Sequence, residues 1–183
     1  MFDSDNVVTL AGPEFAGCRI ATYADLVTPQ MFAAAAGRMK VIHRGLGDPH
    51  NLATIADIEP GCLSVDAGAS LIRQWNQEGR HQPTAYHDRN DWSEVDAKLA
   101  GVPHFTWAAT LDGNCSPDGK RPDAVQILNA DKVGLHVDLS IVWNDKWFPL
   151  PAGPSAGQVH AVKAAYLAFQ QAGPHLAALI DAL

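Results

Sequence analysis

The stretch Ala53-Thr54-Ile55-Ala56-Asp57-Ile58-Glu59-Pro60-Gly61 decides the fold that the sequence predicts. Its β-compatible residues lead into two carboxylates, and the Pro-Gly pair ends the predicted strand. Side chains alternate along a strand, so Asp57 and Glu59 lie on one face about 6–7 Å apart, with Ile58 on the other. Two such carboxylates do not both ionise cheaply without solvent or a cation. One is therefore a candidate general acid; the alternative is a strand end whose acids meet solvent or an arginine.

Composition predicts one globular domain. The chain has 183 residues, of which 47% are hydrophobic and 18% charged, and its formal net charge is −7. This length is enough for one substantial core and too short for two ordinary domains. The negative charge argues against nucleic acid or an anionic membrane as the main partner. Neutral polymers such as glycans stay open as partners.

The cysteines and the first residues bear on the compartment. Cys18, Cys62 and Cys115 are widely spaced and odd in number, with no Cys-x-x-Cys pair, which indicates neither a disulfide framework nor a zinc site. The start, Met1-Phe2-Asp3-Ser4-Asp5, is acidic where a signal peptide is basic. No stretch is long enough to span a bilayer. We expect a protein made in the cytoplasm without a signal peptide or membrane insertion; action at a cell wall or in a phage particle would need another route of export.

Strand and helix signals alternate from residue 19 to residue 142, which predicts an α/β fold with a largely parallel sheet. Predicted strands cover residues 19–24, 40–44, 53–59, 84–87, 104–109, 124–128 and 136–142, with an arm or edge strand at 7–10. Predicted helices begin at the caps Thr28, Ser64 and Asp91. About seven strands is one short of a closed barrel, so we expect an irregular or incomplete (β/α) TIM-like barrel.

Two connections stand out. Only a short loop lies between the strands at 40–44 and 53–59, with no room for a crossover helix, so the pair is either antiparallel or joined by an abbreviated link. Residues 149–157 have the proline- and glycine-rich composition of a linker. We expect a barrel over residues 1–148, and a linker and C-terminal helical extension over 149–183 packed on it; an oligomer contact is the alternative for those helices.

Six separated motifs occur in an order that resembles one family. They are Asp25 after the first strand, Asp57-Ile58-Glu59, Tyr86 to Trp92, Phe105 to Ala109, Val125 to Leu128 and Gly134 to Ser140. Over about residues 19–147 this order resembles the Chalaropsis-type lysozymes (glycoside hydrolase family 25) and their actinobacterial and phage relatives. Those proteins have a modified β/α barrel and cleave the N-acetylmuramyl link of peptidoglycan. The resemblance implies a cell-wall glycan as the partner.

The resemblance also implies roles for particular residues. The family's four acids fall on Asp25, Asp57, Glu59 and Asp138. Glu59 would be the general acid that protonates the leaving oxygen. Asp57 would be either the nucleophile or the group that orients the substrate's acetamido group, as in substrate-assisted glycosidases. Asp25 and Asp138 would tune and position these two.

Substrate-binding residues follow in the same way, namely Tyr86, Trp107, Arg44 and Gln126. Flat aromatic faces suit sugar rings. Arg44 is also the cation best placed in the sequence to pair with the acids. If it paired with Glu59, the pKa of Glu59 would fall and the general-acid role would weaken.

The sequence departs from the family where Arg44 leads to Asp57, because the family normally has two further strand–helix units before its Asp-x-Glu strand. A missing cleft wall affects substrate positioning and water exclusion. The alternative function is therefore a non-catalytic structural or glycan-binding module, for instance a phage virion component, with homo-oligomer or virion assembly.

A metal site is a further alternative. His43, Asp57, Glu59 and His87 carry ordinary ligand groups, but no close-spaced histidine pair supports such a site. We predict neither a metal nor a cofactor.

Overall fold

The structure, a computed structural model, describes residues 1–4, 18–35, 37–111, 122–128 and 137–148. The strands are β1 (Phe2–Asp3), β2 (Ile20–Tyr23), β3 (Met39–His43), β4 (Ile55–Ile58), β5 (Thr84–Asp88), β6 (Phe105–Ala109), β7 (Ala124–Leu128) and β8 (Asp138–Val142). The α-helices are α2 (Pro29–Ala34), α3 (Val65–Gln77) and α4 (Trp92–Lys98), with 3-10 turns η2 (Ala24–Leu26) and η3 (Arg89–Asp91). The arm predicted at 7–10, Cys115 and the extension over 149–183 lie outside the described residues.

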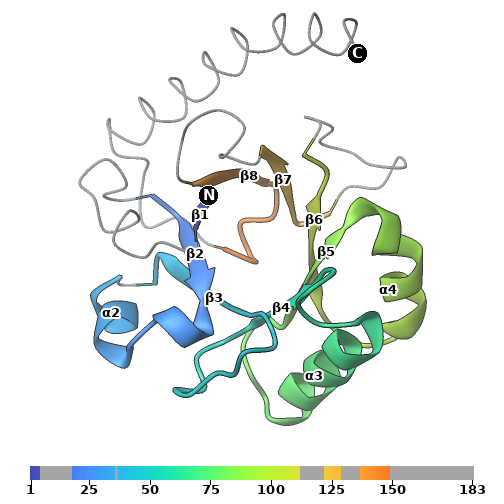
Figure 1. Cartoon of the computed structure of the whole chain (residues 1–183), viewed down its shortest axis with the longest axis horizontal. Helices are drawn as coiled ribbons and strands as arrows, with labels where there is room; N and C mark the ends of the chain where they lie inside the picture. Colours follow the sequence, from blue (N-terminus) through green and yellow to red (C-terminus); the bar gives the residue numbers. More distant parts are fainter. Residues whose placement is uncertain (5–17, 36, 112–121, 129–136, 149–183) are drawn as a thin grey trace, which may run out of the picture.

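The strands form a curled, mostly parallel sheet in sequence order (Figure 1). Neighbours from β1 to β7 are parallel, whereas β8 runs antiparallel to both β7 and β1. Register pairs Phe2↔Leu139 and Asp3↔Asp138 close the ring. The prediction of an α/β fold with a largely parallel sheet is confirmed. The seven strands predicted between residues 19 and 142 are confirmed as β2 to β8. The two-residue strand β1 was not predicted, because so short a segment shows no recognisable period.

Helices α2, α3 and α4 lie outside the curled sheet, against β2 to β6 (Figure 1). Two of the predicted caps are confirmed: Thr28 Oγ1 accepts from Met31 N at 3.2 Å, and Ser64 Oγ accepts from Ala67 N at 3.2 Å. Asp91 makes no capping bond. The predicted helix does begin directly after Asp91, as α4, but the capping bond in this segment is made by Asp88, which caps η3 by accepting from Asn90 N at 2.7 Å.

Aromatic side chains fill the inside of the ring at the ends where the parallel strands begin. Trp147 and Phe148 are almost wholly buried and pack in one cluster with residues from β2 to β7. Trp147 Nε1 donates to Thr84 Oγ1 at 2.7 Å, so the indole N–H is satisfied. This packing leaves the opposite end of the ring, where the parallel strands finish, for polar side chains.

The link between β3 and β4 is the abbreviated parallel connection, not the antiparallel alternative. Asp48 holds it by accepting from Leu52 N at 2.9 Å and from Ala53 N at 2.8 Å. Arg80 then donates to Ala53 O at 2.9 Å from the segment that follows α3. Side-chain bonds to the backbone thus position β4 where a crossover helix is lacking.

Candidate active site

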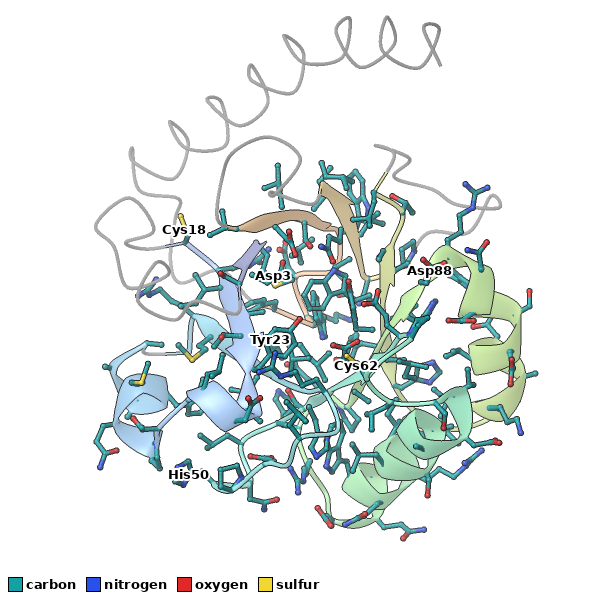
Figure 2. The ribbon with its side chains drawn as sticks, viewed as in Figure 1. Asp3, Cys18, Tyr23, His50, Cys62 and Asp88 are labelled. Carbon is teal, nitrogen blue, oxygen red and sulfur yellow. The ribbon has the colours of Figure 1, made fainter. Side chains whose placement is uncertain are left out.

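Four carboxylates lie where the parallel strands end. Asp57 is in β4 and Glu59 follows it, while Asp3 ends β1. Asp138 begins β8, and because β8 is antiparallel this residue lies at the same end of the ring, as the register partner of Asp3. Charges on Asp138, Asp57 and Glu59 all act on Asp3. Figure 2 shows Asp3, with Tyr23 and Cys62, toward the middle of the ring.

A tight turn fixes the position of Glu59. Cys62 N donates to Glu59 O at 3.0 Å, and Gly61 between them has φ +90°. Proline in the second and glycine in the third position are typical of a type II turn. Leu63 N also donates to Asp57 O at 3.0 Å. The prediction that Pro60-Gly61 ends the strand is confirmed.

Glu59 is the acid with the pKa suited to proton transfer near neutral pH. Burial raises its pKa to about 7, with the charge of Asp57 as the next cause. Asp88 and Asp138 add to this rise. The Tyr86 hydroxyl opposes it by hydrogen bonding to Glu59. Arg44 does not pair with Glu59; its guanidinium binds another acid, Asp25.

Asp57 is almost fully buried, at 1% exposed, and burial raises its pKa to about 6. A hydrogen bond from the Cys62 thiol and the charge of Arg44 work against that rise. Glu59 therefore keeps its proton to a higher pH than Asp57 does. Neighbouring acids with separated pKa values are the pattern expected of an acid and its anionic partner.

Asp3 is a member of this cluster that the sequence analysis missed. It is 7% exposed, and burial followed by the charge of Asp138 raises its pKa well above the ordinary value. Its Oδ1, like Asp57 Oδ1, has no hydrogen-bond partner among the described residues. The available signal was an apolar residue followed by an acid, Phe2-Asp3, which was interpreted only as an acidic start.

Asp25, placed in the cluster by the resemblance, is held by Arg44 in a two-bond ion pair: Nη2 lies 2.6 Å from Oδ2, and Nε 3.1 Å from Oδ1. The bond to Arg44 lowers the pKa of Asp25. The main charges acting on Glu59 come from Asp57, Asp88 and Asp138. The structure thus joins Asp25 to Arg44, whose charge also acts on Asp57, and it adds Asp3 to the cluster of Asp57 and Glu59.

Tyr86 and Gln126 lie beside Glu59. The Tyr86 hydroxyl is 2.5 Å from Gln126 Oε1 and also hydrogen-bonds Glu59. Because a tyrosine has one proton to give, Tyr86 can donate to Gln126 while Glu59 is protonated and donates to it. Once Glu59 has lost its proton, Tyr86 can donate to the carboxylate instead.

Trp107 lies behind Tyr86 and is fully buried. The two ring centroids are 4.5 Å apart, and Trp107 Nε1 donates to Ser140 Oγ at 3.1 Å. The indole therefore supports Tyr86 from inside the ring, with its faces covered by protein.

A polar pocket of about 510 Å³ lies where β5 and β6 end, next to η3. Its lining residues are Asp88, Arg89, Asn90, Ser93, Ala109 and Thr110. Neither Asp88 nor this pocket was singled out from the sequence as part of the site.

Within the described ranges, no group of three or more His, Cys, Asp or Glu residues is arranged to hold a metal ion. His87 follows Tyr86 in β5 and so points out of the ring, where it packs edge-on against Trp92 at 5.3 Å. His43 Nδ1 accepts from Gly45 N at 3.1 Å. Neither imidazole joins the acids.

No protein-family model, curated protein or solved structure matches the chain. The part of the chain that the structure describes contains no helix with the length and apolar character needed to cross a bilayer.

Proposed function

We propose that this chain is a glycoside hydrolase-like protein with a TIM-like β/α barrel, directed at the N-acetylmuramyl link of peptidoglycan. One observation carries the proposal: Glu59, with a pKa raised to about 7, follows the strand of Asp57, whose pKa is about 6, at the end of the ring where parallel strands finish. Enzymes with β/α barrels place their catalytic groups at this end.

In this proposal Glu59 gives its proton to the leaving oxygen of the glycosidic bond. Asp57, ionised at the same pH, acts either as the nucleophile or by holding the acetamido group that attacks in its place. As Glu59 loses its proton, the Tyr86 hydroxyl can turn from Gln126 to the new carboxylate and stabilise it. The nearby charge of Asp138 favours the protonated form of Glu59 before the next turnover.

The test is clearing of purified cell walls, in solution and by zymography. We expect the parent protein to clear and Glu59→Gln to lose at least about a hundredfold in rate, since general acid catalysis is worth about 10²–10⁴. Glu94→Gln, on the exposed side of α4, is the matched control and should clear like the parent. Clearing by parent and Glu59→Gln alike, or by neither, rejects the hydrolase.

Burial of the aromatic residues favours a second candidate, a non-catalytic structural or glycan-binding module such as a phage virion component. Trp107 is not exposed at all and Tyr86 only to 8%, so neither offers an open face to a sugar ring. This candidate predicts that muropeptides bind without turnover and that the purified protein elutes as a symmetric oligomer or associates with a particle.

A further inference from the structure

The pocket beside η3 lies near the acid cluster, and the proposed function does not use it. Its volume of about 510 Å³ lies within the range of about 300–1,000 Å³ that is usual for small-ligand sites. It opens where β5 and β6 end, and Figure 2 shows Asp88 at this place. Because the acid cluster lies at the same end of the ring, a molecule bound at Glu59 could extend into the pocket.

The lining defines the chemistry of the occupant. Ala109 is the one apolar residue among the six, so a hydrophobic ligand is disfavoured. One carboxylate, Asp88, is matched by one guanidinium, Arg89, so neither a strong anion nor a strong cation is favoured. Asn90, Ser93 and Thr110 add an amide and two hydroxyls, which both donate and accept hydrogen bonds. A neutral ligand with many hydroxyl groups fits this combination best.

Internal hydrogen bonds fix part of this lining and leave other atoms for a ligand. Asn90 donates to Asp88 Oδ1 twice, from its backbone N at 2.7 Å and from its side-chain Nδ2 at 2.7 Å. Both bonds use the same carboxylate oxygen, and no described residue bonds to Asp88 Oδ2, so this second oxygen can accept from a hydroxyl. Asn90 Oδ1 can accept from another.

The pocket is also connected to the acid. The charge of Asp88 acts on Glu59 directly. On the other wall, Thr110 N donates to Gln126 O at 3.0 Å, and the side chain of Gln126 contacts the Tyr86 hydroxyl that hydrogen-bonds Glu59. Both walls of the pocket are therefore tied to the proton donor.

We propose that this pocket is a subsite for a neutral sugar ring of the glycan chain, next to the ring whose bond Glu59 protonates. The inference rests on the proposed function for the identity of the glycan. Hydrogen bonds from sugar hydroxyls to Asp88, Asn90 and Ser93 select the ligand, and no aromatic platform is required.

The experiment titrates the full chain carrying Glu59→Gln, labelled with 15N, with the neutral trimer of N-acetylglucosamine, so that binding is observed without turnover. We expect amide shifts at Asp88, Asn90 and Thr110. Asn90→Ala and Ser93→Ala, each added to Glu59→Gln, should weaken the dissociation constant at least fivefold. Gln77→Ala, an exposed polar change on α3, is the matched control and should leave it unchanged.

Three results would overturn the subsite: no binding of the trimer, shifts confined to another face, or equal affinity in the pocket variants and the control. Tighter binding of an anionic stem peptide than of the trimer at these residues would overturn the neutral ligand. Because binding is measured without hydrolysis, failure of the clearing assay alone rejects the enzyme and not the subsite. Clearing without trimer binding rejects the subsite alone.

Discussion

Replacing Gly68 with alanine tests how closely α3 must approach the strand of the acids. Gly68 is buried in α3, and a Cβ there would lie 2.4 Å from Cγ1 and 2.6 Å from Cδ1 of Ile58. Both distances are shorter than real Cβ contacts, so Ile58 or the helix must move. Ile58 separates Asp57 from Glu59 in the chain, and any displacement therefore acts on the acid pair.

Two opposing effects of Gly68→Ala determine the change in the free energy of unfolding. Overpacking a buried site costs about 1–3 kcal/mol, whereas replacing glycine by alanine inside a helix returns about 1 kcal/mol. We expect Gly68→Ala to lower the free energy of unfolding by up to about 2 kcal/mol and Tm by up to about 6 °C. Urea denaturation followed by circular dichroism and tryptophan fluorescence measures the change.

A double-mutant cycle isolates the contact. In an Ile58→Ala background only the Ile58 Cβ remains, 3.7 Å from the new methyl group, which is an ordinary contact. There Gly68→Ala should stabilise the protein by up to about 1 kcal/mol. Ser70→Gly and Ser70→Ala, at an exposed position inside the same helix, together measure the effect of helix propensity. Destabilisation by Gly68→Ala of equal size in both backgrounds would refute the argument.

Three further predictions concern the acids. The pKa values of Glu59 and Asp57 are raised in the folded chain, so between about pH 4 and pH 7 the native state holds more protons than the unfolded state. The free energy of unfolding should therefore fall as pH rises through this range. Glu59→Gln should make this dependence on pH weaker and should stabilise the protein at pH 7.5; an unchanged dependence in denaturant titrations would contradict this. Cys62→Ala should raise the pKa of Asp57 above about 6, because the hydrogen bond from the thiol to the Asp57 carboxylate is lost. Cys62→Ser keeps a donor and should leave this pKa near 6. Carboxyl 13C NMR measures both values, and equal shifts in the two variants would contradict a role for the hydrogen bond. Asp57→Asn should lower the pKa of Glu59 below about 7, because Asp57 supplies the main charge acting on Glu59. Asp25→Asn should change the pKa of Glu59 much less. A larger effect from Asp25→Asn would show that Asp25, and not Asp57, is the main charged neighbour of Glu59.

Local signals in the sequence were enough for much of the fold. Ser64 followed by the apolar face of α3 predicted that helix, because a cap and a 3.6-residue period both lie within one segment. β1 could not be predicted, since its two residues are strand-like only through pairing with β2 and β8. Asp88 and Asp91 both precede α4, and the sequence does not tell which of them makes the capping bond.

The candidate site likewise contains residues that local sequence signals reveal and residues that meet only through the pairing of distant strands. Asp57 and Glu59 were found because their spacing within one strand defines a shared face. Asp3 and Asp138 meet only through the pairing of β1 with β8, which no local pattern encodes. Asp25 was assigned to the cluster by the family resemblance, as an acid that follows a clear strand, and Asp3 follows no strand that the sequence reveals. The pairing of Asp25 with Arg44 depends on the neighbouring ends of β2 and β3.

The pairing of β1 with β8 has a consequence for the order of folding. Each strand from β2 to β7 pairs with its sequence neighbours, so these contacts close short loops. Contact between Phe2 and Leu139 joins residues near opposite ends of the described strands, and such distant contacts are entropically expensive to form early. The sheet should therefore grow from the middle and seal last at β1. Asp3 then joins Asp138 only in that final step, and a half-folded chain has no complete set of acids.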